Sequence, residues 1–403
     1  MKARRIVGVL AFVGFWLGTA GRVPAESSAT GNVNSIGPIH INGDGGFAAC
    51  GCASLVGGVW VIGPRSISGA PGDGVLIENV TVLFQLLNMT VNKSQGAGIR
   101  LKNVKLNGAT VIAGTQTSLQ NNNIGIVIEY STGVVADGGG SNPTGWGIVA
   151  SGNAGTINKN YLGGIDVENS SFITIRGWHL SANGQDGTPD WIAFDPGTDH
   201  WSIGGVRFLN VTSSVIDHNS ANNDTSISYS LWNSSYNVVT SNTGDYPFTA
   251  NLLLADGSSF NTVDQNSFGT ADFVGILVAD PLPPSSFGSS SNNTITNNIV
   301  HTSGPTGAEI KSGQAPDFVG GIVLLNSVSN NVVRSNQLWS NSGTDLKWAQ
   351  ETVDLSSPTG VRSYPLTAVC NVFPFGPPFN GNIWNGNSFR TQDICPGEVP
   401  LQP

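Results

Sequence analysis

Short runs of aliphatic and β-branched residues, each followed by a polar turn, recur along most of this chain. Four segments align with one another: VRFLNVTSSVIDHNSAN, ISYSLWNSSYNVVTSNTG, ANLLLADGSSFNTVDQNSFG and GIVLLNSVSNNVVRSNQLW. An earlier copy, GGIDVENSSFITIRGWH, occupies 163–179. Each copy has an apolar run, a turn at Asn or Asp, and a second short run before another Asn. Runs of this length bounded by Asn, Ser and Gly predict strands.

The turn residues repeat about every 23 residues. One column has steps of 23, 23 and 24, and consists of Asn210, Asn233, Asp256 and Asp280, with Asn169 in the earlier copy. A second column begins with steps of 23 and 24 and widens to 32 and 38 where loops intervene: Asn219, Asn242, Asn266, Asn298 and Asn336. A period near 23, with two or three strands per unit and no helical segment, predicts the coils of a parallel β-helix.

Stacked coils bury an apolar cylinder that no single coil could bury alone. Alternation within the strands predicts that Val215, Val239 and Ile295 share one face. Asn accepts left-handed turn geometry, and stacked side-chain amides can bond from coil to coil. We therefore interpret the Asn columns as structural. The fold class is all-β, a solenoid of about 10–12 coils with end caps.

Two stretches carry a resemblance to a known group of proteins. SLWNSSYNVVTSNTG and VLLNSVSNNVVRSNQLW resemble the repeats of the right-handed parallel β-helix superfamily, which includes pectate lyases, polygalacturonases, alginate epimerases and NosD-like periplasmic proteins. GDGVLIENVTVLFQLLNMTVN is similar to the opening coils of NosD-like chains. The resemblance spans roughly residues 60–350 and implies a right-handed coil, while one scaffold hosts many chemistries.

The chain divides into four predicted parts: a signal peptide at 1–25, a flexible linker at 26–38, the β-helix at 39–350 and a C-terminal cap or tail at 351–403. Lys2, Arg4 and Arg5 precede a short apolar run from Ile6 to Leu17, with cleavage expected after Ala20 or Ala25. This run is shorter than the ~20 residues of a membrane span. We expect a secreted, periplasmic or cell-surface protein; an uncleaved anchor is the alternative.

Composition narrows the choice of partners. Charged residues are 11% of the chain, and four of its 17 basic residues precede the later cleavage point, leaving 13 against 26 acidic residues. A strongly acidic chain disfavours nucleic acid and anionic membranes, and counts against a polyuronate unless a basic patch or bridging cations intervene.

Four cysteines, Cys50, Cys52, Cys370 and Cys395, suggest disulfides in an exported chain. A bridge between Cys370 and Cys395 would staple the C-terminal segment. For Cys50 and Cys52 a strained disulfide and a soft-metal site, such as one for copper, both remain open.

The first candidate site is an insertion. Asn169 and Asn210 are 41 residues apart, 18 more than one coil, and most of the excess falls within 180–203. Solenoid insertions form loops on one face, often the binding face. This one contains GQDGTPDWIAFDPGTDHW, with candidate catalytic residues Asp195, Asp199 and His200 and, for stacking on sugars, Trp178, Trp191 and Trp201. Its aspartates could also hold Ca²⁺. The alternative is that the tryptophans anchor the loop and the acids are solvated.

The second candidate is an outward-facing column formed by the residue two before each ladder Asn: Arg176, Asp217, Thr240, Asp264, Thr296 and Arg334. Two coil steps separate Asp217 from Asp264, ~9–10 Å, the upper end of the carboxyl spacing in an inverting glycosidase. His218 adjoins this column, and Arg176 or Arg207 could serve as a base in a lyase. Chance alignment of polar residues on a solvent face is the alternative.

The third candidate is the basic stretch GIRLKNVK, in which Arg100, Lys102 and Lys105 could bind an anion or could form a solvated strand face. The catalytic motifs of enzymes in the β-helix superfamily are absent or altered in this sequence. No Gly-His-Gly occurs, EIKSG at 309–313 has only a faint likeness to an Arg-Ile-Lys element, and FDPGTDH has Gly197 where alginate epimerases carry a histidine.

The leading hypothesis is an exported protein that binds and processes a polysaccharide, as a lyase or glycoside hydrolase, in a groove near 180–203. Asp195, Asp199, His200, Asp217 and His218 are the catalytic candidates. The predicted binding residues are Arg176, Trp178, Trp191, Trp201, Arg207 and Asp264. The alternative is a non-catalytic periplasmic or cell-surface scaffold, NosD-like or adhesive.

Overall fold

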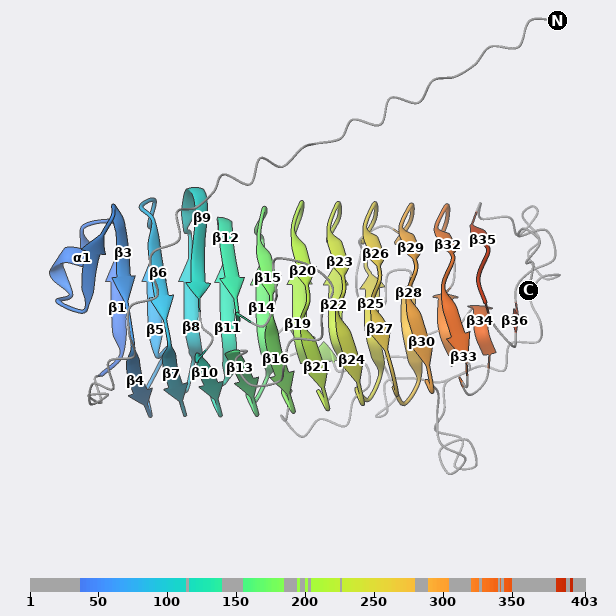
Figure 1. The fold of residues 1–403 in the computed structure, drawn as a ribbon, viewed down its shortest axis with the longest axis horizontal. Coiled ribbons are helices and arrows are strands. Elements are labelled where there is room, and N and C mark those ends of the chain that lie inside the picture. The colour runs from blue at the N-terminus through green and yellow to red at the C-terminus, as the bar shows by residue number, and fades with distance from the viewer. Residues whose placement is uncertain are drawn as a thin grey trace, which may run out of the picture. The chain divides into compact units, whose positions relative to one another are not determined.

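A computed structural model describes residues 37–113, 116–139, 155–184, 194–195, 200–201, 204–224, 227–279, 289–303, 320–325, 328–339, 341, 344–349, 382–388 and 392–393. The coils belong to the compact unit that runs from Asn34 to Pro403. They stack along one axis, from β1 at the N-terminal end to β36 (Figure 1).

Three long sheets run along this axis. Sheet 1 contains, in order, β1 (Ile39–Asn42), β5 (Val75–Glu78), β8 (Ala97–Lys102), β11 (Ile124–Glu129), β14 (Gly163–Glu168), β19 (Gly204–Leu209), β22 (Ile227–Trp232), β25 (Ala250–Ala255), β28 (Val274–Ala279), β31 (Gly320–Leu325), β34 (Thr344–Ala349) and β36 (Gln392–Asp393). Sheet 2 contains β2 (Ala53–Val56), β3 (Val59–Ile62), β6 (Phe84–Leu87), β9 (Lys105–Ala113), β12 (Thr132–Asp137), β15 (Thr174–Arg176), β20 (Val215–Asp217), β23 (Val238–Thr240), β26 (Thr262–Asp264), β29 (Thr294–Thr296), β32 (Val332–Arg334) and β35 (Ile383–Asn385). Sheet 3 contains β4 (Arg65–Ser68), β7 (Met89–Asn92), β10 (Ser118–Gln120), β13 (Gly155–Asn158), β16 (Trp178–Ser181), β21 (Ser220–Asn222), β24 (Thr243–Asp245), β27 (Ser267–Phe268), β30 (Ile299–His301) and β33 (Gln337–Trp339).

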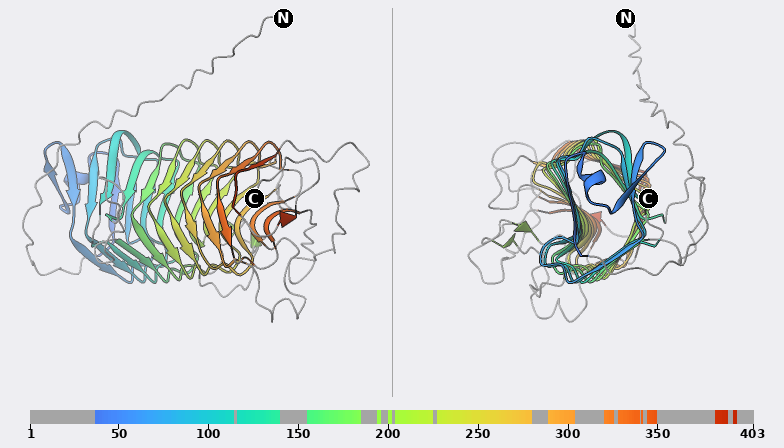
Figure 2. Two further views of the ribbon diagram at one scale, coloured as in Figure 1. Left: turned by 45° about the vertical axis from the view of Figure 1, so that its right-hand side comes forward. Right: turned by 90° about the vertical axis from the view of Figure 1, so that its left-hand side faces the viewer.

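Each regular coil contributes one strand to each sheet in the order 1, 2, 3, and successive coils pair in parallel. The described exceptions are two antiparallel pairs, β2 with β3 and β17 (Phe194–Asp195) with β18 (His200–Trp201). Viewed along the axis, the coils superimpose (Figure 2). Parallel crossovers within one sheet are right-handed in nearly all proteins. The predicted fold, a right-handed parallel β-helix of 10–12 coils, is confirmed by sheets of 12, 12 and 10 strands.

The core fills the inside of the coils. In sheet 1 one inward column is fully buried over six coils: Ile165, Val206, Tyr229, Leu252, Ile276 and Ile322. In sheet 2 the inward column contains Ile216, Val239, Val263 and Ile295. The prediction that Val215 shares a face with Val239 was wrong by one position, because Val215 pairs with Val238 and only partly buries its side chain.

The Asn columns form the predicted ladders. Asn242 donates its backbone N–H and its side-chain Nδ2 to Oδ1 of Asn266 in the next coil, at 2.9 and 3.1 Å, and Nδ2 also contacts the Ile216 carbonyl at 2.9 Å. Asn266 repeats this pattern toward Asn298. Asn210 and its described counterparts in the turn column have a left-handed φ. In the buried ladder, the left-handed φ belongs to the residue before each Asn, such as Gln265 before Asn266. The amides therefore satisfy backbone groups that would otherwise be buried without partners.

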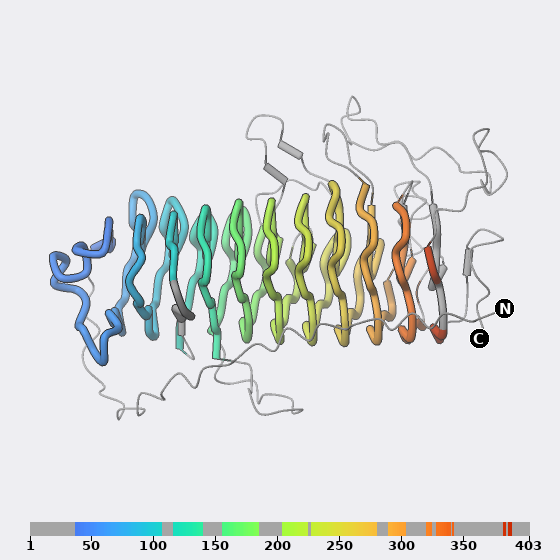
Figure 3. The backbone as a smooth tube through the Cα atoms, turned by 90° about the horizontal axis from the view of Figure 1, so that it is seen from above, coloured from blue at the N-terminus to red at the C-terminus, as the bar shows by residue number. Residues whose placement is uncertain are grey.

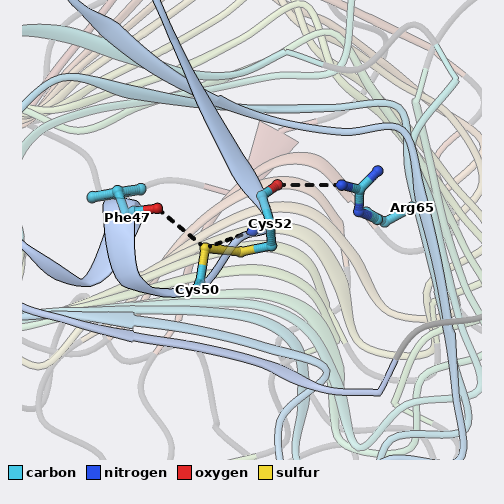
Figure 4. Close-up of a disulfide and its surroundings, with 4 residues drawn as sticks. All are labelled: Phe47, Cys50, Cys52 and Arg65. Carbon is cyan, nitrogen blue, oxygen red and sulfur yellow. Dashed lines mark hydrogen bonds between the residues drawn. A yellow bond between two sulfur atoms is a disulfide. The ribbon is translucent and has the colours of Figure 1, made fainter.

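The N-terminal end is closed by local structure. The short helix α1 (Gly46–Ala49) buries Phe47, whose ring stacks on Trp60 of the β2–β3 hairpin at 5.8 Å. Cys50 and Cys52 form a disulfide, and Arg65 donates to the Cys52 carbonyl (Figure 4). Of the two alternatives for this pair the structure has the disulfide. Cys370 and Cys395 lie outside the described residues.

The C-terminal boundary differs from the prediction. β35 and β36 continue sheets 2 and 1, and Asn382 and Asn387 extend the two Asn ladders by a further coil. Coil structure thus extends past residue 350 (Figure 3). In the described part of the chain, no helix is long and apolar enough to cross a lipid bilayer.

Candidate functional site: a carboxylate–arginine cluster on sheet 1

The insertion predicted as the groove is only partly described. Its backbone forms the β17–β18 hairpin, in which Asp195 and His200 are register partners. Asp199 and Trp191 lie outside the described residues, and the side chains of Asp195, His200 and Trp201 are not described. The catalytic roles predicted for this segment therefore stay predictions.

The outward column of sheet 2 has the predicted register. Arg176, Asp217, Thr240, Asp264, Thr296 and Arg334 pair from coil to coil. Each acid, however, has its own local partner. Asp217 contacts Nδ1 of His218, while Asp264 accepts from Thr296 at 2.9 Å and from Asn297 at 2.7 Å. Arg176 contacts Asp137, its register partner in the preceding coil, at 2.7 Å. The column is a row of separate contacts.

Trp178 lies in the core. Its side chain is 1% exposed, and Nε1 donates to the Ala136 carbonyl at 3.0 Å. The prediction that this indole stacks on a sugar is wrong, because β16 turns position 178 inward.

The basic stretch is not a free cationic patch. Arg100 contacts Asp73 at 2.8 Å and Glu129 at 3.3 Å, and Lys102 contacts Glu129 at 3.8 Å. Lys105 begins β9 in a different sheet. The positive charges of Arg100 and Lys102 are therefore matched by acids on neighbouring coils.

These pairs belong to a larger cluster on the outer face of sheet 1. Register aligns two adjacent columns across β8, β11, β14 and β19: Arg100, Val127, Asp166 and Arg207 in one, and Lys102, Glu129, Glu168 and Leu209 in the other. Outward positions of neighbouring strands lie ~4.8 Å apart. Three basic and three acidic side chains thus lie on four consecutive coils, in a chain that is only 11% charged.

Arg207 lies at the β19 end of the cluster and contacts two of its acids. Its guanidinium binds Asp166 through two parallel contacts, Nε to Oδ1 and Nη2 to Oδ2, both 2.9 Å, and Nη2 also reaches Oε1 of Glu168 at 2.6 Å. The Arg207 and Asp166 side chains are 2% and 5% exposed. Burial alone would lower the pKa of Arg207, but the two carboxylates outweigh it and raise that pKa. A bidentate buried pair of this kind is geometrically rigid.

Arg207 lies where the outer face of sheet 1 changes from charged to apolar side chains. In the next coil the register partners of Arg207 and Leu209 are Ser230 and Trp232, both buried, and Trp232 begins a face of buried apolar side chains. This second cluster includes Trp232, Leu253, Leu277 and Val323. The charged cluster therefore borders a low-polarity surface, which strengthens its internal interactions.

Glu168 has the property most relevant to chemistry. Its pKa is raised from 4.5 to about 7, first by burial and then by the charge of Asp166, with Arg207 opposing and Glu129 adding to the rise. Its side chain is nevertheless 18% exposed, and that of its register partner Glu129 is 15% exposed. A carboxyl group that reaches solvent and titrates near neutral pH can both donate and accept a proton.

Sequence reasoning named Arg207 as a binding residue but missed Asp166, Glu168 and Glu129. They occupy ordinary outward strand positions, and only the register brings them beside Arg207. One signal was available: Asp166 and Glu168 alternate along one strand in a charge-poor chain. Within the described ranges, no three His, Cys, Asp or Glu side chains are arranged to hold a metal ion.

Comparison with known proteins adds little to this geometry. No protein-family model and no curated protein matches the chain. Among solved structures, a variant of the periplasmic alginate epimerase AlgG is 10% identical, covers 90% of this chain and 82% of its own, and has a TM-score of 0.37. A pectate lyase from Paenibacillus sp. 0602 is 11% identical, covers 62% and 64%, and has a TM-score of 0.27.

A third solved structure, the endo-xylogalacturonan hydrolase from Aspergillus tubingensis, is 11% identical, covers 74% of this chain and 90% of its own, and has a TM-score of 0.22. At these values we transfer no residue role from any of the three. The assignment rests on the chain's own strand register: three parallel sheets and continuous Asn ladders make it a right-handed parallel β-helix protein.

Proposed function

We propose that this protein is an exported glycoside hydrolase that binds a polysaccharide on the outer face of sheet 1 and cleaves it with Glu168 and Glu129. The single observation that carries the proposal is the environment of Glu168, a partly exposed carboxyl whose pKa is about 7 beside the buried Asp166–Arg207 pair. The basic and apolar residues within 2–17 support the export part of the proposal.

The roles divide by environment. Glu168 is the proton donor, and Glu129, paired with Arg100 and Lys102, is the nucleophile. They are register partners on adjacent strands, ~4.8 Å apart at the backbone, which suits the short carboxyl separation of a retaining enzyme. Asp166 does not fit either role, because Arg207 occupies both of its oxygens.

The reaction proceeds in two balanced steps. Glu168 gives its proton to the glycosidic oxygen while Glu129 attacks the anomeric carbon, so the old C–O bond breaks and a glycosyl ester forms. Water then attacks the same carbon, Glu168 takes one proton back, and the Glu129 carboxylate is released. Arg207 and Asp166 position Glu168 throughout.

The charge pattern supports a neutral substrate. Cations of the cluster are already paired with acids, and the chain as a whole carries a net charge of −9. A polyanion would meet no unpaired positive charge among these residues and would be repelled at long range. Ca²⁺ bound by the insertion stays a prediction, tested by assays with and without EDTA.

The test is reducing-end release from a panel of neutral and acidic glycans by wild type, Glu168→Gln and Glu129→Gln. Glu78→Gln is the matched control, because Glu78 lies in the same outward column one coil beyond Lys102. We expect both site variants to lose about 10²–10⁴-fold in kcat, with the control unchanged. Wild-type activity should fall as pH rises through about 7, where Glu168 loses its proton.

Three outcomes contradict the proposal. Unsaturated products would indicate elimination instead of hydrolysis, and full activity in Glu168→Gln would remove the assigned donor. Absence of turnover on every glycan would favour the second candidate, a non-catalytic scaffold.

A further inference from the structure

A different surface, the corner where sheet 1 passes into sheet 2, carries exposed aromatic side chains. Tyr130, Phe172, Tyr236 and Phe260 are 55%, 60%, 62% and 50% exposed. All four have left-handed φ, between 52° and 61°. Bulky side chains seldom adopt this conformation, and an exposed ring gains little from packing. We call Phe172, Ser213, Tyr236 and Phe260, one on each of four consecutive coils, the aromatic corner.

This corner combines a stacked pair of rings with a position that has no ring. Tyr236 and Phe260 stack with centroids 5.1 Å apart and planes inclined by 4°. Isolated bridges pair Ser171 with Thr212 and Thr212 with Ser235 on successive coils. The residues that follow these three, Phe172, Ser213 and Tyr236, therefore occupy one column in that order. Phe172 and Tyr236 are therefore two coil steps apart, ~9.6 Å. The aromatic column is interrupted at Ser213 by a gap one ring wide.

The surroundings of the gap are polar but uncharged. Asn169, Asn210 and Asn233 form a side-chain amide ladder along the corner, with contacts of 3.1 and 2.6 Å. Thr212 adds an exposed hydroxyl beside it, and Ser235 a partly exposed one. Segments 169–173, 210–214 and 233–237 contain no Asp, Glu, Lys, Arg or His. Within these segments the surface therefore offers no charged group that could bind an ion.

We propose that the aromatic corner binds a neutral glycan chain that runs across the solenoid axis, with one sugar ring between Phe172 and Tyr236 above Ser213. A ring at the middle of the gap is ~4.8 Å from each wall, close to the 5.1 Å step of the Tyr236–Phe260 stack. Apolar C–H faces of a pyranose pack on aromatic rings, and its hydroxyls bond to the flanking amides and hydroxyls. A charged glycan would gain no ion pair there.

This inference goes beyond the proposed function, since it concerns an adjoining surface and holds whether or not Glu168 performs chemistry. The corner begins at Asn169, directly after Glu168, so it would hold a polymer beside the face that acts on it.

Isothermal titration of the full chain with cellohexaose, mannohexaose and chitohexaose tests the proposal, with hexagalacturonate as the charged comparison. Two variants remove a wall, Phe172→Ala and Tyr236→Ala, and Ser213→Phe fills the gap. Tyr246→Ala is the matched control, because Tyr246 is 57% exposed with a φ of 60° but lies at the corner between sheets 3 and 1. Alanine and tyrosine carry similar strain at a left-handed φ, so the fold is retained; thermal unfolding verifies this.

We expect at least one neutral hexasaccharide to bind wild type and to bind each of the three corner variants about tenfold more weakly. Tyr246→Ala and Glu168→Gln should bind as wild type does. The proposal is overturned if no neutral hexasaccharide binds, if only hexagalacturonate binds, or if Ser213→Phe binds with unchanged affinity. Repeating the corner titrations in the Glu168→Gln background reads binding without turnover, so inactivity of Glu168→Gln bears only on the hydrolase proposal.

Discussion

Asp224 ends one of the buried ladders, and its carboxyl group makes a quantitative prediction possible. This ladder lies at the corner between sheets 3 and 1, where Asn122 donates its backbone N–H to Oδ1 of Asn160, and Asn160 donates in the same way to Asn183. Asn183 donates both its backbone N–H and its Nδ2 to Oδ1 of Asp224, each at 3.0 Å. The corresponding residue in the next coil is Pro247, which offers no acceptor side chain, so the ladder stops.

The second oxygen of Asp224 occupies the place of an amide nitrogen. Nδ2 of Asn160 donates to the Leu119 carbonyl and Nδ2 of Asn183 to the Ile157 carbonyl, each in the sheet 3 strand of the preceding coil. By register, the carbonyl facing Asp224 is that of Leu180. Oδ2 is buried and accepts no hydrogen bond from a described residue. A protonated Oδ2 would donate to this carbonyl, whereas a carboxylate would repel it.

The pKa of Asp224 is raised accordingly, from 3.8 to about 7, by burial, which outweighs the two bonds from Asn183. Below pH 4 the folded and unfolded states both hold this proton, so Asp224 does not lower the free energy of unfolding. Between about pH 4 and 7 only the folded state holds it, and stability falls by ~1.4 kcal/mol per pH unit, reaching about 4 kcal/mol above pH 7. Tyr229, the neighbouring titratable group, has a pKa raised by burial and by Asp224, so it stays neutral over this range.

Asp224→Asn replaces the second carboxyl oxygen with an Nδ2 that can donate to the Leu180 carbonyl, and it removes the titratable group. We expect its free energy of unfolding to match wild type near pH 4 and to exceed it by up to about 4 kcal/mol at pH 8. Urea unfolding of both proteins from pH 4 to 8, followed by circular dichroism, measures this difference. A variant less stable than wild type at pH 8, or a difference that does not change with pH, would refute the reasoning.

Two further substitutions test the architecture. Arg207→Ala leaves Asp166 buried without its bidentate partner and should lower the free energy of unfolding by about 3–5 kcal/mol in denaturant titrations; a loss under 1 kcal/mol would mean that the pair is not desolvated. Asn266→Ala removes the hydrogen bonds to Asn298 and to the Val239 carbonyl, and should lower the free energy of unfolding by about 1–3 kcal/mol. The control is Gln265→Ala at the adjacent exposed position, which should change this free energy little. Equal losses in the two variants would count against a stabilising role of the ladder.

Much of the fold follows from local sequence. The 23-residue spacing of Asn210 and Asn233 predicts the coil, because each coil must return the chain to the same corner. Alternation predicts the inward columns, although short three-residue strands leave a one-position ambiguity, and Val215 was assigned to the wrong face for that reason. The C-terminal continuation at Asn382 and Asn387 was missed because a long intervening segment hides the period.

The candidate site depends on information that no local pattern contains. Glu129, Glu168 and Arg207 are separated by 39 residues at each step, and each is an unremarkable outward residue in its own strand. Trp178 was assigned to a sugar-binding surface because its type suits that role, whereas its register turns it into the core. Acids that stood out in sequence, such as Asp217, proved to have local partners.

The sequence by itself determined the periodic features of this protein, since period, turn chemistry and apolar alternation are properties of neighbouring residues. Only the tertiary structure decided which side chains meet, because the stacking of coils ~4.8 Å apart places residues of successive coils side by side. The raised pKa of Glu168 and the gap at Ser213 both arise from this stacking. A side chain's chemistry in this fold is set mainly by the coil before it and the coil after it, which lie tens of residues away along the chain.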